Sequence, residues 1–144
     1  MTKTENLTDR IDTTGAQDWK LLFDLLPQIK SSKKFGRLVG SRRMPDGTMS
    51  LPFWLEDEIV SKFFNTAYFL GIVVVFDWSS WTEGIDILNN PASDFNQYDL
   101  STLCKLLTII VRGDKFCEGY LINAFETGTV TKIVEAMQAK LYRR

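Results

Sequence analysis

The sequence predicts a mainly α-helical fold of the α+β class: a compact domain of five to six helices with a small β-hairpin docked on one side. Apolar residues recur at spacings of three and four over most of the chain, which is the period of an amphipathic helix. One Pro-Asp-Gly turn separates two β-like arms. With 144 residues, 44% hydrophobic and 24% charged, the composition is typical of one globular domain.

The first helix is expected to follow a polar lead-in. Residues 1–14 offer little to bury, so we expect them to be flexible, with a single globular domain over residues 15–144. The apolar face of the helix consists of Trp19, Leu22, Phe23, Leu26 and Ile29. Because Pro27 falls inside this pattern, the helix should end or kink near Leu26.

The hairpin is expected over residues 35–54. Its turn, Met44-Pro45-Asp46-Gly47, fits a type I turn followed by a glycine bulge. In the second arm Met49, Leu51 and Phe53 alternate with polar residues, so we expect this face to be buried. An isolated hairpin is marginally stable in water and should therefore dock on the helices.

Two further helices are predicted in the middle of the chain. Three carboxylates at 56–58 suit the positive end of the first helix, and Gly71 suits its C-terminal stop. Residues 72–76 are too short and β-branched for a helix, so we expect an extended segment, with the hairpin as its candidate partner. Asp77 should cap the next helix, which ends at Asn-Asn-Pro, residues 89–91.

The last three helices are predicted from residue 99 onwards. Asp99 should cap a long helix whose wide apolar face indicates the centre of the core. Gly113 should end it, and Asp114 should cap a second helix, on which apolar residues pair four apart at 116–117, 120–121 and 124–125. Gly128 should end that helix before an amphipathic helix that begins at Thr129.

The composition argues against several kinds of site. The chain has no histidine, which excludes Ser-His-Asp and Cys-His catalysis, and it contains no phosphate-binding glycine loop. We therefore lean against an enzyme and expect no catalytic residues, metal or cofactor. The two cysteines, Cys104 and Cys117, are expected to be reduced, small buried hydrophobes. No apolar run or N-terminal pattern indicates a membrane span or signal peptide, so we expect a cytoplasmic protein.

Charge is unevenly distributed although the net charge is only −1. Residues 30–43 contain six basic residues and no acid, whereas residues 44–104 contain nine acids and one base. The candidates for contacts with a nucleic-acid backbone are Lys33, Lys34, Arg37, Arg42 and Arg43. The interpretation we favour is a solvated basic face, or one paired with the acidic middle of the chain, because no known nucleic-acid-binding motif appears and the pI is about 5.5.

Charged residues also crowd the joint between the two helices at residues 112–118. The favoured interpretation is structural: Asp114 caps a helix, Glu118 lies near its positive end, and Arg112 binds last-turn carbonyls or an acid. The alternative is a pocket that binds a ligand or partner, with Glu126 contributing. Direct acid–base catalysis by Glu118 or Asp114 is the least favoured, because no nucleophile is recognisable.

Trp78 and Trp81 are the remaining candidates for that pocket. They lie three residues apart and should share a helical face. Such a pair is more often packed against another helix than exposed as a stacking platform for a ring, and both alternatives stay open.

The order of motifs in the second half resembles a known family. Phe-Asp-Trp-Ser-Ser-Trp-x-Glu-Gly at residues 76–84 precedes Val-Arg-x-Asp-Lys-Phe-x-Glu-Gly at residues 111–119. This order resembles the DUF6508-like proteins, a bacterial and mobile-element family of unknown function, and the resemblance covers residues 54–141. It implies no activity, and the basic segment before Thr48 lies outside it.

These observations leave three hypotheses for function. The leading one is a small cytoplasmic accessory or interaction protein, of phage or mobile-element origin, with a protein partner or a second copy bound at residues 78–84 and 112–118, at the basic hairpin, or at both. The alternative is a small-molecule-binding protein or carboxylate-dependent enzyme with its pocket at the 112–118 corner. Nucleic-acid binding through the hairpin is third.

Overall fold

The computed structural model describes residues 16–41, 43–114, 116–117 and 119–142. The helices of the N-terminal half are α2 (Ala16–Phe23), α3 (Leu26–Ser31) and α4 (Glu58–Phe69), with strands β1 (Gly36–Val39) and β2 (Phe53–Glu56) between α3 and α4. The C-terminal half contains η1 (Trp78–Ser80), α5 (Thr82–Asn89), η2 (Phe95–Gln97), α6 (Leu100–Gly113), α7 (Tyr120–Glu126) and α8 (Thr129–Tyr142). The mainly helical class with a small hairpin is therefore confirmed. The expected flexible lead-in, residues 1–14, lies outside the described residues.

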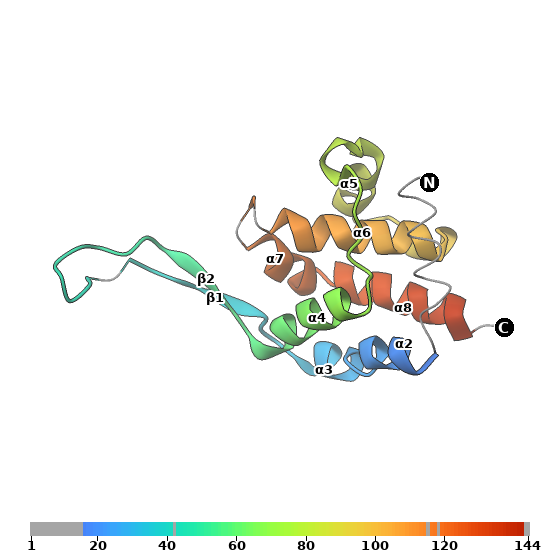
Figure 1. Ribbon diagram of the computed structural model, residues 1–144, viewed down its shortest axis with the longest axis horizontal. Helices are drawn as coiled ribbons and strands as arrows, with labels where there is room; N and C mark the ends of the chain where they lie inside the picture. The colour runs from blue at the N-terminus through green and yellow to red at the C-terminus, as the bar shows by residue number, and fades with distance from the viewer. Residues whose placement is uncertain (1–15, 42, 115, 118, 143–144) are drawn as a thin grey trace.

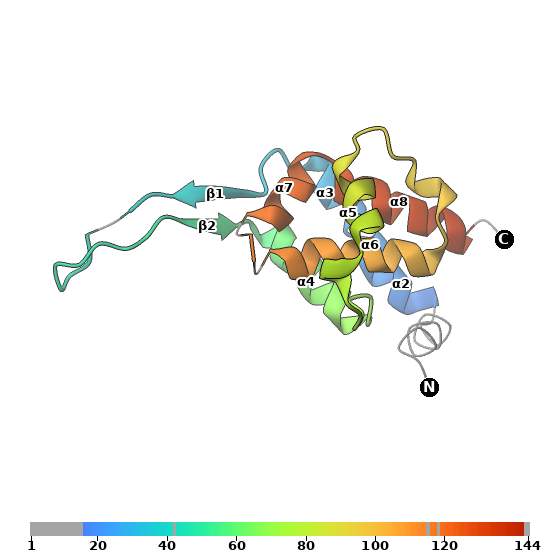
Figure 2. The same ribbon diagram turned by 90° about the horizontal axis from the view of Figure 1, so that it is seen from above.

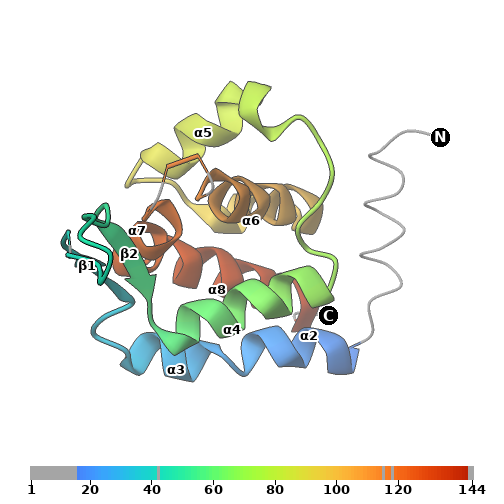
Figure 3. The same ribbon diagram turned by 60° about the vertical axis from the view of Figure 1, so that its left-hand side comes forward.

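The core is organised around α6. This helix contacts α5, α7 and α8, and its fully buried side chains include Leu103, Leu106, Leu107 and Ile110. Figure 3 shows α2, α3 and α4 along one side of the body and α5 on the other, with α6 and α8 between them. The central position expected from the wide apolar face of this helix is confirmed.

The first predicted helix is two helices. α2 ends at Phe23 and α3 begins at Leu26, with Pro27 in its first turn. A proline is tolerated there because the first N–H groups of a helix have no partner within the helix. The predicted break near Leu26 is confirmed.

Residues 72–76 form neither a helix nor a strand, and they do not pair with the hairpin. The Val74 N–H donates to the hydroxyl oxygen of Thr108 on α6 at 3.0 Å, and that hydroxyl donates to the Cys104 carbonyl at 2.8 Å. Thr108 is fully buried and is the only buried polar side chain among the described residues. Ile72, Val73 and Val74 are also buried, so the segment is held to the core by apolar packing and by Thr108. The expected pairing with the hairpin is wrong.

The hairpin forms with the predicted turn. β1 and β2 pair antiparallel from Gly36 opposite Glu56 to Val39 opposite Phe53. The Gly47 N–H donates to the Met44 carbonyl at 2.9 Å, and Gly47 has a φ of 89°. This is the type I turn with a glycine bulge.

The hairpin packs on the helices only near its base, where Trp54 of β2 also lies against Gly119. Phe35 lies 5.2 Å from Phe125 of α7, ring centre to ring centre, and Gly36 lies against Ile122. We call residues 37–55 the arm, and its described part beyond Trp54 projects away from the helical body (Figures 1 and 2).

The buried face expected for the second arm is wrong. Met49, Leu51 and Phe53 are 59%, 83% and 39% exposed. The helices end at the base of the hairpin, so the outer part of the arm has no helical surface to pack on (Figure 1).

Candidate functional site

The corner between α6 and α7 differs from the prediction in one respect. Asp114 accepts a hydrogen bond from the Leu121 N–H at 3.0 Å, so its carboxylate satisfies one N–H of the first turn of α7, but the N-cap residue is Gly119 and not Asp114 as predicted. The helix begins at Tyr120, after Gly119, whose φ is 89°. Phe116 and Cys117 lie in a turn before it and are exposed, so their expected burial on a helical face is wrong.

The charged residues of the corner do not gather in one described pocket. Arg112 is half-buried in the last turn of α6, and no described carboxylate lies within ion-pair distance of it. Glu126 is exposed at the end of α7. Glu118 and Lys115 lie outside the described residues.

Asp114 instead lies near a second carboxylate. A shallow pocket of about 340 Å³ is lined by Glu56, Ser61, Phe64, Asn65, Val111 and Asp114. Burial, and secondarily the charge of Asp114, raise the pKa of Glu56 above its ordinary value. Two carboxylates alone do not define a site, because among the described residues no three side chains of the metal-binding types are grouped.

Trp78 and Trp81 do not share a helical face, because the chain bends between them. Trp78 belongs to η1, whereas Trp81 precedes the first residue of α5. The Trp78 ring contacts the exposed Phe116, with 5.7 Å between ring centres. The Trp81 ring packs edge-on against Phe76 and lies where a Cβ on Gly84 would be, so Gly84 permits this contact.

The basic residues lie on and beside the arm. Lys33 and Lys34 are exposed just before the base of the hairpin, and Arg37 and Arg43 are exposed on the arm itself. Arg42 lies outside the described residues. None of these described cations forms an ion pair with another described residue. Apolar residues at least 36% exposed accompany them on the arm: Leu38, Met44, Met49, Leu51, Phe53, Trp54 and Leu55.

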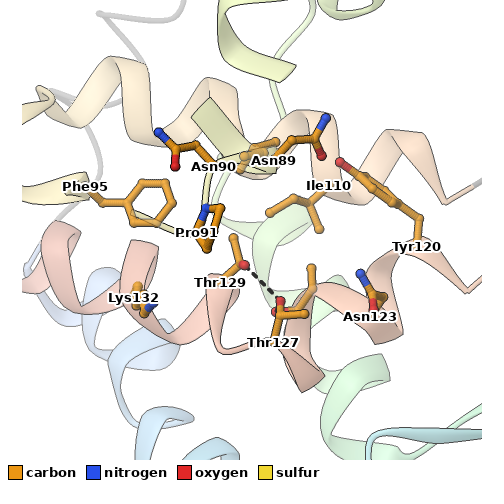
Figure 4. Close-up of a pocket in the computed structure, with 12 residues that line it drawn as sticks. Asn89, Asn90, Pro91, Phe95, Ile110, Tyr120, Asn123, Thr127, Thr129 and Lys132 are labelled. Carbon is orange, nitrogen blue, oxygen red and sulfur yellow. Dashed lines mark hydrogen bonds between the residues drawn. The ribbon is translucent and has the colours of Figure 1, made fainter. Parts of the chain in front are cut away.

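A second pocket was not anticipated from the sequence. It has a volume of about 360 Å³ and lies where the end of α5 meets α6, α7 and α8. Its apolar lining includes Phe95, Ile110 and Ala124, all buried. Its polar lining residues are Asn89, Asn90, Tyr120, Asn123, Thr127, Thr129 and Lys132 (Figure 4).

Some polar groups of this pocket already have partners and others do not. The side-chain amide oxygen of Asn90 accepts from the Ala92 N–H at 3.0 Å, and the hydroxyls of Thr127 and Thr129 share a hydrogen bond of 2.9 Å. The side chains of Asn89, Tyr120, Asn123 and Lys132 form no hydrogen bond to another described residue. Burial, and secondarily the neighbouring thiol of Cys117, raise the pKa of Tyr120, so its hydroxyl is a protonated donor at neutral pH.

Comparison with known proteins identifies a family and no activity. A family model described as "Family of unknown function (DUF6508)" matches residues 14–143, so the chain belongs to this family. No curated protein and no solved structure matches the chain. None of the helices in the described ranges is both long and apolar enough to span a membrane.

Proposed function

We propose that this member of the DUF6508 family is a non-enzymatic interaction protein that binds a partner protein along the arm. One observation carries the proposal: the arm projects from the helical body with seven large apolar side chains exposed on 19 residues of chain (Figure 1). Large apolar side chains gathered on an exposed segment mark contact sites in soluble proteins. A cytoplasmic location and a mobile-element origin remain parts of the proposal.

The composition of the arm favours a protein partner over a nucleic acid. Protein interfaces are enriched in aromatic residues, Met and Arg, and the arm carries Phe53, Trp54, two methionines and three arginines. The edges of its two strands are unpaired within the described sheet, so a partner strand has a template for hydrogen bonds. A nucleic-acid backbone would use the cations but leave the leucines and methionines in water.

Charge identifies the kind of protein surface that fits. Between residues 33 and 55 the chain has five basic residues and one acidic residue. Two such arms would repel one another, so the arm fits an acidic surface of a different protein better than the arm of a second copy. Burying Leu51 and Met49 would supply the apolar part of the binding energy, while Arg37 and Arg43 would set orientation and association rate.

Photo-crosslinking from the arm tests the proposal. Benzoylphenylalanine is placed at Leu51 in the full chain in cells of the source organism, and at Leu21, an exposed leucine of α2, as the matched control. We expect one discrete protein adduct from position 51 that is absent from position 21. The double variant Arg37→Glu/Arg43→Glu should remove it, whereas Lys20→Glu/Lys62→Glu on the body should not.

Other results would overturn the proposal. Equal adducts from both positions, or adducts that survive reversal of the two arginines, would mean that the arm is not the contact surface. An adduct of twice the chain's mass would make the partner a second copy. Salt-dependent retention on DNA that disappears in Arg37→Glu/Arg43→Glu, without a protein adduct, would assign the arm to nucleic acid.

A further inference from the structure

The pocket between α5, α6, α7 and α8 has an excess of donors. Lys132 brings an ammonium group, Tyr120 brings a protonated hydroxyl, and Asn123 brings an amide, each without a hydrogen-bond partner among the described residues. Asn89 adds a second such amide. Figure 4 shows Asn89, Tyr120 and Asn123 at one end of the pocket and Lys132 at the other end, on the side of Phe95. The described lining residues include no carboxylate that would neutralise the ammonium group.

The formal charge on the described lining residues is positive. Lys132 is its only charged lining residue in the described part of the chain. Thr129, the first residue of the 14-residue helix α8, also lines it, so the positive end of the helix dipole adds to the charge of Lys132. An ammonium group without an ion-pair partner among the described residues favours an oxyanion over a cation.

Part of the pocket lining is apolar. Ile110 of α6 and Ala124 of α7 contribute to it, and Figure 4 shows Phe95 at one end. A volume of about 360 Å³ lies at the small end of the range for ligand pockets. The space therefore fits a small molecule with an apolar body and a polar head, rather than a free inorganic ion.

We propose that this pocket binds a small organic anion whose carboxylate or phosphate group is held by Lys132 and whose apolar body contacts Phe95 and Ile110, toward the donors of Tyr120 and Asn123 at the other end. The site is separate from the arm and does not depend on the function proposed for it. It also differs from the 112–118 corner, because neither Arg112 nor Asp114 lines it.

An NMR titration of the ¹⁵N-labelled full chain tests the proposal. The probes are benzoate and phenyl phosphate, with benzyl alcohol as the neutral analogue and sodium chloride at matched ionic strength. We expect roughly millimolar binding, as the ligand efficiency of small molecules predicts, with shifts clustered at residues 89–91, 120–127 and 129–132. The neutral analogue should bind at least about tenfold more weakly, since it lacks the charge-assisted hydrogen bond. Whichever anion binds more tightly identifies the head group.

Two variants make the result specific. Lys132→Gln should weaken binding of both anions by about tenfold or more, whereas Lys62→Gln on α4 removes the same charge elsewhere and should change nothing. Asn123→Asp is nearly isosteric at an exposed position and should abolish binding by placing a negative charge on the pocket. Shifts that are absent, scattered, reproduced by chloride, or unchanged in Lys132→Gln would overturn the proposal.

Discussion

Replacing Gly119 by alanine tests how firmly the base of the arm is fixed. Gly119 has a φ of 89°, and a Cβ there would lie 2.6 Å from Nε1 of the Trp54 indole. Gly128 has a similar φ of 80°, but a Cβ there would have no neighbour within 4 Å. Both substitutions force a left-handed residue, at about 1 kcal/mol, and only Gly119→Ala adds a collision, at about 1–3 kcal/mol. We therefore expect losses of about 1 kcal/mol for Gly128→Ala and about 2–4 kcal/mol for Gly119→Ala.

Denaturant unfolding measures both losses, and the indole N–H signal of Trp54 reports whether its ring has moved. Removing the ring provides the control for the collision. In a Trp54→Ala background, Gly119→Ala and Gly128→Ala should cost the same within about 0.5 kcal/mol, because only the backbone strain remains. Equal losses in the native background, with an unshifted indole signal, would refute the contact between Trp54 and α7.

Three further predictions concern the body of the protein. Thr108→Val leaves the Val74 N–H unpaired in the core, so it should lower the free energy of unfolding by about 1–3 kcal/mol. Hydrogen exchange at the Val74 amide should become faster, and unchanged exchange there would contradict this role of Thr108. Asp99→Ala should cost about 1 kcal/mol at neutral pH. Hydrogen bonds from Thr102 in the first turn of α6 lower the pKa of Asp99. The stabilisation by Asp99 is therefore present above its unfolded-state pKa and is lost as pH falls through its folded-state pKa. Unfolding curves of Asp99→Ala and the unsubstituted protein that fail to converge in acid would refute this. Thiol titration of the native protein should find Cys117 reactive and Cys104 protected, because Cys117 is exposed and burial raises the pKa of Cys104 to about 12. Two reactive thiols in the native protein would rule out the burial of Cys104.

Features set by neighbouring residues could be predicted from the sequence. The Asp99 cap, the break at Pro27 and the glycine bulge at Gly47 each depend on a few consecutive residues, and each is present. The start of α7 was missed because apolar spacing continues through Phe116 and Cys117. Gly119 adopts a left-handed conformation that ends the turn there, and a helix can begin only after it.

Features that depend on how distant segments meet could not be predicted. Alternation in the second arm shows which side chains share a face, but not whether another element covers that face. The proposed anion-binding pocket is lined by Asn89, Asn123 and Lys132, which lie on three separate helices, so no local sequence pattern predicts it. The placement of Glu118, and with it the 112–118 hypothesis, stays a prediction.

The two proposed sites share one short helix, which decides which variants can separate them. α7 supports the base of the arm, because Ile122 lies against Gly36 and its N-cap Gly119 lies against Trp54. The same helix lines the pocket through Tyr120 and Asn123. A substitution that shifts α7, such as Gly119→Ala, should therefore weaken both activities together. Lys132 lies on α8 and Arg43 lies far along the arm, so Lys132→Gln should spare partner binding and reversal of the arm charges should spare anion binding. Loss of both activities in either variant would mean that the two surfaces form one site.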